Sequence, residues 1–434
     1  LAGCEAALYL AKNGFEVELY EQKPYKFSPA HKNSGFAELV CSNSLKADRL
    51  DSASGLLKAE MKLLGDCLLE VAERCRVAAG GALAVDRTEF SRQVTELVEN
   101  TPGIAIRREE VRFVGETRPD TITIVATGPL TEGELAQDIA RLTGGQKLSF
   151  YDAAAPIVTA ESLNMDRIFA ASRYGRGEAD YLNCPFDKEG YEAFHAALQN
   201  AERAPLHDFD GDLTVYEGCM PIEVMAGRGA DTMRYGPLRP VGLTDPRTGH
   251  RPWANVQLRA ENTERSMYNL VGFQTNLKFG EQRRVFGMIP ALRNAEFVRY
   301  GVMHRNSFVD APHALAATFG IPGTRARLAG QITGTEGYVE AIASGLLAAL
   351  NTYADLAGLG HVALPATGAL GSLVAYATDP ATKDYQPMHV NYGIVPPIEL
   401  PGRVSKTHKR EALAARAATD LDAYLATRPE LFSL

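Results

Sequence analysis

The stretch LAGCEAALYLAKNGFEVELYEQKPYKFSPAHKNSGFAELVCSNSLK, residues 1–46, decides the fold. Residues 1–13 predict a helix, and Gly14 suits its C-cap because glycine tolerates a left-handed backbone. Residues 15–20 predict a strand that leads to the acid Glu21. A glycine at a helix start, followed by a strand and an acid about 20 residues on, is typical of a dinucleotide-binding unit.

The dinucleotide-binding pattern predicts roles for several residues of the stretch 1–46. Gly3 lies at the helix start, where free N–H groups and a partial positive charge suit a pyrophosphate. Glu21 is expected to accept the ribose hydroxyls, and Lys23 is placed beside it as a cofactor-binding residue. The polar segment 41–46 then brings the thiol of Cys41. A cofactor cradle that leads directly to a cysteine predicts a redox or covalent site.

The dinucleotide motif is incomplete in this sequence. The chain starts at a leucine, and the first strand and first two glycines of G-x-G-x-x-G are absent. The geometry of the motif places about ten residues before Gly3. Because that strand is normally central, a polypeptide made as written is expected to have a destabilised parallel sheet and weak retention of its cofactor.

Composition limits the class of protein. The chain has 434 residues, of which 45% are hydrophobic and 23% charged, as in soluble globular proteins. No run approaches the ~18 apolar residues of a membrane span, and no signal peptide is visible. The cysteines form no C-x-x-C pair and no metal spacing, so reduced thiols in the cytoplasm are expected. The net charge of −8 argues against a generally basic nucleic-acid binder but leaves room for a local basic patch.

Two later segments predict a return to the cofactor. The strand 121–126 ends in Thr127-Gly128, a pair that lets the backbone approach a cofactor closely and is the usual second contact of FAD-binding folds. Residues 328–351 predict a strand, a glycine-rich turn and a small-residue helix. Together with the first unit they predict a two-ended FAD site. The cofactor-binding residues expected in the turn are Gly330, Gln331, Gly334, Gly337 and Tyr338.

The expected fold class is therefore α/β: an FAD-binding Rossmann-like domain of the glutathione-reductase type with an inserted α+β substrate domain. The FAD-binding domain takes residues 1–150 and 306–360, the inserted domain 151–305, and a loop-rich segment with a helix 361–434. Locally, the sequence predicts one helix over residues 50–74. It also predicts capping boxes at Asp86/Glu89 and at Thr131/Glu134.

The inserted segment carries its own candidate residues. Cys219 lies between Gly218 and Pro221, which predicts an exposed, rigid turn. Basic residues then concentrate and alternate with aromatic ones, which predicts either a phosphate-binding face or an ordinary solvated surface. The basic residues are Lys278, Arg283, Arg284, Arg293, Arg299 and Arg305, and the aromatic ones Phe279, Phe286, Phe297 and Tyr300. His304 adds an imidazole near the return to the cofactor fold.

These segments together resemble the TrmFO family, the folate- and FAD-dependent tRNA (uracil-5-)-methyltransferases. The resemblance covers essentially the whole chain in the right order. The related wobble-uridine flavoproteins of the GidA/MnmG type share the FAD segments but carry a further C-terminal helical domain. The matching segments are 1–3, 41–44, 181–185, 217–223, 303–306 and 330–340.

The resemblance implies a reaction and its partners. The family takes its carbon from 5,10-methylenetetrahydrofolate, uses reduced FAD as reductant with NAD(P)H recharging it, and methylates C5 of the T-loop uridine at position 54 of tRNA. Its two catalytic cysteines match Cys41 and Cys219. One thiolate adds to uracil C6 and the other group removes the C5 proton; Cys219 is assigned the first role, with the order left open.

The remaining roles follow from the same resemblance. His304 is the candidate for stacking on the pterin, with Tyr338 as the second choice, and Glu217 and Glu223 are candidates for orienting the site. The residues expected to hold tRNA are Lys278, Arg283, Arg284 and Arg305. No metal, DNA or membrane partner is implied.

Three other interpretations stay open. The chain could be a wobble-uridine modifier, which the paired cysteines and the missing C-terminal domain disfavour. It could be a non-catalytic flavin-containing tRNA-binding protein, which has no use for Cys41 and Cys219. A small-molecule flavin oxidoreductase is the third, and salt-sensitive tRNA binding counts against it.

Overall fold

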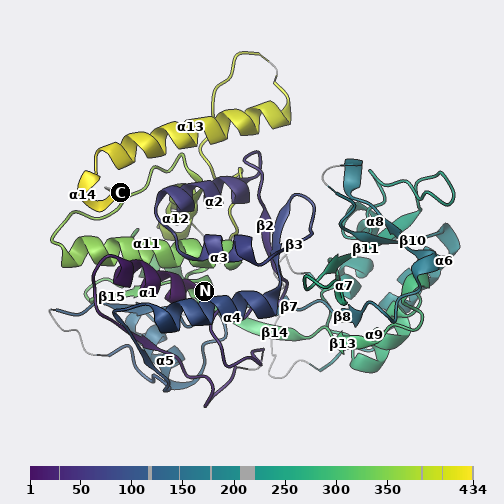
Figure 1. The fold of residues 1–434 in the computed structure, drawn as a ribbon, viewed down its shortest axis with the longest axis horizontal. Coiled ribbons are helices and arrows are strands. Elements are labelled where there is room, and N and C mark those ends of the chain that lie inside the picture. The colour runs from purple at the N-terminus through teal and green to yellow at the C-terminus, as the bar shows by residue number, and fades with distance from the viewer. Residues whose placement is uncertain are drawn as a thin grey trace.

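The computed structural model divides the chain into two lobes that two strands connect (Figure 1). Strands β7 (Lys147–Ala153) and β14 (Met303–Val309) pair antiparallel along their full length and run between the lobes. The structure describes residues 1–28, 30–115, 120–145, 147–175, 178–205, 220–382, 385–402 and 404–432, with the backbone alone for 147–152 and 304–305.

The larger lobe contains two short parallel strand pairs. Strand β1 (Val17–Tyr20) pairs with β5 (Ile104–Arg107), and β6 (Thr123–Val125) pairs with β15 (Ala326–Leu328). The two pairs form separate sheets in the described part of the chain. Segments far apart in sequence therefore meet in one lobe, as the two-ended cofactor site requires.

Helix α1 (Ala2–Lys12) packs along the buried helix α11 (Tyr338–Leu356). A Cβ on Gly345 would lie 2.3 Å from the backbone oxygen of Ala2, so the two helices touch backbone to backbone. This contact joins the first and the last part of the cofactor site. It also explains a glycine in the middle of a helix, where glycine otherwise destabilises.

The other elements of the larger lobe surround this pair, with α13 lying across the outer side (Figure 1). Strands β2, β4 and β3 form a small antiparallel sheet in that order. The bounds are β2 (Ser44–Ala47), α2 (Ala53–Leu63), α3 (Leu68–Arg74), β3 (Arg76–Val77), β4 (Ala82–Val85), α4 (Arg87–Asn100), α5 (Gly133–Leu142), α10 (Ala311–Ala314), η5 (Gln331–Thr333), α12 (Ala369–Thr378), α13 (Lys406–Ala426) and α14 (Pro429–Phe432).

The single helix expected over residues 50–74 is wrong. The chain forms α2 and α3 instead, with a break at Gly65, whose φ is +85°. The apolar residues keep a helical spacing across the break, which is why periodicity alone missed it. Glycine in a left-handed conformation ends the first helix.

The two expected capping boxes also differ from the prediction. The Asp86 carboxylate does cap α4, accepting from the backbone N–H of Thr88 and Glu89 at 3.0 Å. The reciprocal bond is missing, because the Asp86 N–H donates to the Cys75 oxygen and Glu89 pairs with Arg92.

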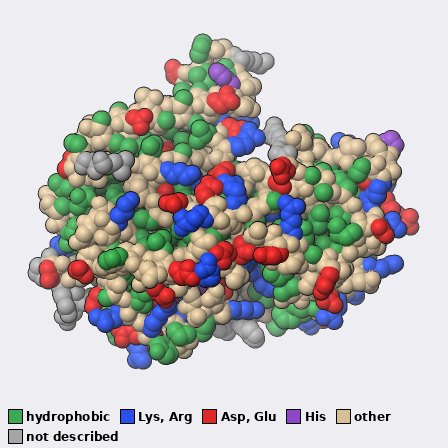
Figure 2. Space-filling model, in the orientation of Figure 1, with side chains coloured by type: hydrophobic (Ala, Val, Ile, Leu, Met, Phe, Trp, Pro, Cys, Tyr) green, Lys and Arg blue, Asp and Glu red, His purple; other side chains and the backbone are tan. Residues whose placement is uncertain are grey.

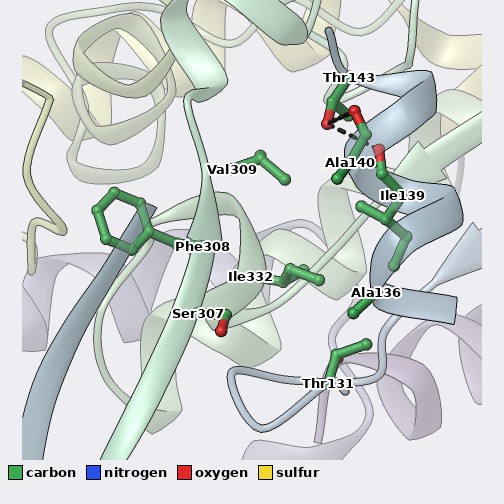
Figure 3. Close-up of a pocket in the computed structure, with 9 residues that line it drawn as sticks. All are labelled: Thr131, Ala136, Ile139, Ala140, Thr143, Ser307, Phe308, Val309 and Ile332. Carbon is green, nitrogen blue, oxygen red and sulfur yellow. Dashed lines mark hydrogen bonds between the residues drawn. The ribbon is translucent and has the colours of Figure 1, made fainter. Parts of the chain in front are cut away.

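At the second box, α5 begins at Gly133 rather than after Thr131. The Thr131 hydroxyl donates to the Gly128 oxygen at 2.7 Å and so stabilises the turn before the helix. Figure 3 shows the inner face of α5 turned toward β14 and Ile332 around an apolar cavity of about 20 Å³. This volume is about that of one water, and the cavity is a packing void of the helix–strand interface.

The smaller lobe is built on an antiparallel sheet of six strands in the order β13-β8-β12-β11-β10-β9. It has its own core, in which Phe194, Phe273 and Phe286 are fully buried. The bounds are β8 (Ile157–Thr159), η1 (Met165–Arg167), β9 (Phe169–Ala170), η2 (Arg173–Gly175), β10 (Leu182–Phe186), α6 (Lys188–Gln199), α7 (Ile222–Gly227), α8 (Thr232–Tyr235), β11 (Ala254–Ala260), β12 (Met267–Leu270), α9 (Phe279–Phe286), η4 (Pro290–Leu292) and β13 (Phe297–Arg299).

The domain boundaries expected at residues 150 and 305 fall inside the connecting strands β7 and β14. The domain division itself stays a prediction. No helix within the described ranges is both long and apolar enough to cross a membrane.

A buried carboxylate in α1 predicts that stability depends on pH. Glu5 is fully buried and accepts the backbone N–H groups of Cys67 and Leu68 at the start of α3, at 2.9 and 3.0 Å. Burial, with a smaller contribution from Asp66, raises the pKa of Glu5 from 4.5 to about 8. Between these values the folded chain holds a proton that the unfolded chain has lost, so stability falls as pH rises.

The free energy of unfolding of the wild type should therefore fall between pH 4.5 and 8, by at most about 1.4 kcal/mol per pH unit from this group. Urea unfolding at several pH values measures it. Glu5→Gln should flatten the slope in this window, whereas Glu16→Gln, at an exposed carboxylate before β1, should leave it unchanged. Equal slopes in the wild type and Glu5→Gln would contradict the prediction.

Candidate functional site

A large cavity of about 1470 Å³ gathers most of the predicted cofactor residues. This exceeds the usual volume of small-ligand pockets, which is roughly 300–1,000 Å³. The wall includes β1, the end of β6 and the starts of α1 and α11. The predicted residues on it are Gly3, Glu21, Lys23, Cys41, Thr127, Gly128, Gly330, Gln331, Gly337 and Tyr338.

The cavity wall fits a flavin dinucleotide. Helices α1 and α11 both start on it, and no side chain caps either N-terminus, so their first N–H groups are available to phosphate oxygens. Gly128 has φ +77° and open space where a Cβ would lie, which leaves its backbone accessible. Gly3 packs closely on the strand end, since its Cβ would lie 3.3 Å from that of Ala126.

Several of the predicted cofactor residues make hydrogen bonds within the protein. The Glu21 carboxylate accepts the backbone N–H of Lys23 at 2.9 Å, and the Lys23 ammonium donates to the Gly35 oxygen. Lys23 therefore ties down the loop after β1. Gln331 donates to Glu336 at 2.6 Å and so rigidifies the glycine-rich turn.

Gly334 is the predicted cofactor residue that does not line the cavity. It has φ +81°, and a Cβ there would lie 2.3 Å from the Tyr385 hydroxyl. The structure explains this glycine by the tight turn and the close tyrosine.

Cys41 lies partly exposed on the cavity wall, and its backbone is held on both sides. Its N–H donates to the Tyr338 hydroxyl at 2.7 Å, and its thiol lies 3.7 Å from the Ala153 oxygen. Tyr338 begins α11, so the helix that opens on the cofactor cavity also positions the cysteine. The phenol that was the second choice for stacking on the pterin thus contacts the Cys41 backbone.

Arg299 holds the other side of this backbone. Its guanidinium donates to the oxygens of Val40 at 3.0 Å and Cys41 at 2.8 Å, and to Ala155 at 3.3 Å. Burial, with the nearby charge of Arg87, lowers the pKa of Arg299. The expectation that Arg299 belongs to a phosphate-binding face is wrong, because its side chain points inward from β13 and joins the smaller lobe to the cysteine segment.

A buried polar network supports the same segment from behind. The Asn43 amide donates to the oxygens of Val85 and Ala260, both at 3.0 Å, and its oxygen accepts from Arg259 at 2.9 Å. Arg87 bonds Glu261 at 2.7 Å and the Leu39 oxygen at 2.9 Å. The segment 39–43 is therefore tied to β11 and the residue after it.

The residues of the cavity wall for which the sequence predicted no role include Lys46, Asn306 and His389. The Lys46 ammonium pairs with the buried carboxylate of Glu340 at 2.6 Å, which links β2 to α11. Lys46 belongs to the polar segment after Cys41, and this position was the sequence signal that could have placed it at the cavity. His389 lies in a loop without any regular pattern, so the sequence offered none.

The other described cysteines are structural. Cys4, Cys75 and Cys184 are buried, and none of the five described cysteines forms a disulfide. Burial raises the pKa of Cys75 to about 11 and that of Cys67 to about 12, so both stay thiols at neutral pH.

The second predicted catalytic cysteine, Cys219, lies outside the described residues, as does Glu217. Glu223 is described and fully buried. It accepts the Asn276 N–H at 2.7 Å and the Thr275 hydroxyl at 2.8 Å, and so holds the loop before α9. Its contacts are those of a structural residue of the smaller lobe.

Of the predicted substrate residues whose side chains are described, Lys278, Arg283 and Arg284 do not line the cavity. His304 and Arg305 are backbone positions of β14, opposite Asp152 and Tyr151, and their side chains lie outside the described part. Lys278 pairs with Glu202 and Arg284 with Glu281, both at 2.6 Å, while Arg283 donates to Tyr300. Figure 2 shows basic and acidic side chains interspersed over the face that it draws.

Comparison with known proteins agrees with this geometry. The family model described as Glucose inhibited division protein A matches residues 1–359. The form II crystal structure of Aquifex aeolicus GidA superposes with a TM-score of 0.70 at 14% identity, covering 100% of this chain and 72% of that one. The fold and the cavity thus define a protein of the GidA class, and the expected fold class is confirmed.

Two curated relatives narrow this class. The methylenetetrahydrofolate--tRNA-(uracil-5-)-methyltransferases TrmFO of Moorella thermoacetica and Geobacter sulfurreducens are 54% and 53% identical. The alignments cover 96% and 98% of this chain and 94% and 97% of theirs. The chain belongs to the TrmFO family, and the resemblance seen in the sequence is confirmed.

Proposed function

We propose that this chain is a folate- and FAD-dependent tRNA (uracil-5-)-methyltransferase. The main support for this proposal is the sequence identity above 50% to TrmFO proteins over nearly the whole chain. The cavity supports it from the structure, because one continuous wall holds two open helix N-termini and the thiol of Cys41. A flavin-containing RNA binder has no need for that thiol.

The proposed chemistry assigns distinct tasks to the chain and its cofactor. When bound, reduced FAD supplies the reducing equivalents that turn a methylene group from methylenetetrahydrofolate into a methyl group. The chain must make C5 of uracil nucleophilic, which a thiolate achieves by adding to C6, and it must then remove the C5 proton. We assign these steps to Cys41 and Cys219, with the order left open.

The finer assignments belong to the same proposal. The target is the T-loop uridine at position 54, NAD(P)H recharges the flavin, and His304 stacks on the pterin. The residues 151–305 form the part that contacts tRNA, and the enzyme acts in the cytoplasm without a DNA or membrane partner. The uridine must leave its stack to enter the cavity, as in other enzymes that act on a base.

The test is product formation on an unmodified tRNA transcript. The wild type is incubated with FAD, NADPH and methylenetetrahydrofolate labelled in its one-carbon unit, and the digested RNA is analysed for labelled 5-methyluridine. Label is expected at the T-loop uridine, and only when folate is present. Modification at the wobble uridine would support the GidA-type alternative, and RNA binding without any modified base would support the non-catalytic one.

A further inference from the structure

Three aromatic rings stack on the smaller lobe, outside the cofactor cavity. Tyr300 lies between the other two: its ring centre is 4.7 Å from that of Phe279, at 18°, and 5.2 Å from that of Phe297, at 9°. Phe279 is 54% exposed. We call these three residues the aromatic stack. It presents a half-exposed ring on which another planar group can stack.

The charges around the aromatic stack favour an anionic ligand. Arg283 lies one turn after Phe279 on α9 and donates to the Tyr300 hydroxyl at 2.7 Å, which holds its guanidinium beside the rings. Arg293, four residues before Phe297 in the chain, is exposed and makes no hydrogen bond or ion pair within the described residues. Lys278 and Arg284 pair with their own carboxylates, so of these four described basic residues Arg283 and Arg293 keep an uncompensated charge, on a chain with a net charge of −8.

An exposed ring with neighbouring cations is the chemistry that binds unpaired nucleotides. Bases stack on aromatic side chains, and basic side chains contact the phosphates. A protein partner of purely apolar character would leave Arg283 and Arg293 without a counter-charge. In Figure 2, hydrophobic and basic side chains adjoin over α9.

The aromatic stack is also tied to the Cys41 segment. Phe297 begins β13 and Tyr300 follows it directly, while Arg299 between them turns inward to the oxygens of Val40 and Cys41. Phe297 of the aromatic stack and Arg299, which anchors the cysteine segment, therefore belong to one short strand. A base stacked on Phe279 would keep a fixed position relative to that thiol.

We propose that the aromatic stack is a nucleobase-binding platform. It takes an unpaired base of the same RNA whose uridine enters the cavity, with Arg283 and Arg293 at the phosphates. The platform rests on the proposed function for the identity of that RNA. It contributes to RNA affinity and register and takes no part in the chemistry.

The experiment compares Phe279→Leu and Phe279→Trp with the wild type in methyl transfer to a tRNA transcript. Leucine keeps an apolar side chain without a ring, and tryptophan keeps the stacking surface. We expect Phe279→Leu to raise KM for tRNA roughly ten- to a hundredfold with kcat within about twofold, and Phe279→Trp to keep the wild-type KM. The control is Tyr235→Leu on α8, an aromatic residue of the same lobe that is 84% exposed.

The outcomes separate this proposal from the proposed function. If the wild type methylates tRNA and Phe279→Leu keeps its KM, the platform is wrong while the function stands. If the wild type does not methylate tRNA, the proposed function fails. The platform is then tested alone, by fluorescence quenching of a single-stranded oligoribonucleotide that contains 2-aminopurine. Quenching that Phe279→Leu removes supports the platform, and the absence of quenching overturns it. A change of oligomeric state in Phe279→Leu with unchanged RNA binding would assign the rings to a second copy and also overturn it.

Discussion

Replacing Cys41 by alanine is expected to lower methyl transfer to tRNA by about a thousandfold or more, without loss of bound FAD. The thiol lies on the cavity wall, and the two anchors of this residue, from Tyr338 and Arg299, bond to its backbone. Alanine keeps both anchors, so the substitution removes the sulfur and little else. Methyl incorporation, together with flavin absorbance of the purified protein, measures the effect.

The matched control is Cys67→Ala. Cys67 is also partly exposed, but it lies at the start of α3 outside the cavity lining, and burial raises its pKa to about 12. This variant should keep wild-type activity. Activity of Cys41→Ala within tenfold of the wild type would remove Cys41 from the proposed mechanism and leave Cys219 to act with another base.

Replacing Arg299 by glutamine is expected to lower kcat about a hundredfold and to reduce the free energy of unfolding by roughly 2–4 kcal/mol. The substitution leaves backbone oxygens of Val40, Cys41 and Ala155 without their charged donor in a largely buried site. The cysteine segment then loses its fixed position, whereas the cofactor wall on the other side of the cavity is untouched. Steady-state kinetics and urea unfolding measure the two effects.

A role in positioning can be separated from a general loss of stability. Arg299→Lys keeps the charge and one donor and should recover part of kcat, with KM for tRNA close to that of the wild type. The rate of Cys41 alkylation by iodoacetamide should change in Arg299→Gln, because the backbone that positions the thiol loses its anchor. Arg251→Gln, at an exposed arginine of the same lobe, is the control. Unchanged alkylation and kcat in Arg299→Gln would reduce Arg299 to a structural residue.

Most segments of the cavity wall that the sequence predicted carry local signals. These signals are a glycine at a helix start, a strand that ends in Thr127-Gly128, and the glycine-rich turn from Gly330. Each can be interpreted from the neighbouring residues alone. The structure brings these segments to one cavity wall. Their assignment to the two ends of one site needed no knowledge of distant packing.

Other features of the fold and of the candidate site depend on tertiary contacts that the sequence does not show. Arg299 is one of several arginines among aromatic residues, and only the pairing of β13, with its irregular register between Phe297 and Arg299, turns it inward. Gly65 breaks a helix whose apolar spacing continues on both sides, so periodicity could not reveal the break. The sequence predicts Lys278 and Arg284 at phosphates, and their ion pairs with Glu202 and Glu281 depend on contacts in space.

The contact between α1 and α11 has a consequence for synthesis on the ribosome. Gly345 meets Ala2, so the first helix gains this partner only after more than three hundred further residues have been made. The sheet of the smaller lobe uses strands from residues 157–299 and can form earlier. The face of α1 that packs on α11 therefore stays uncovered while the middle of the protein folds, and the cavity wall that the two helices share is complete only near the end of translation.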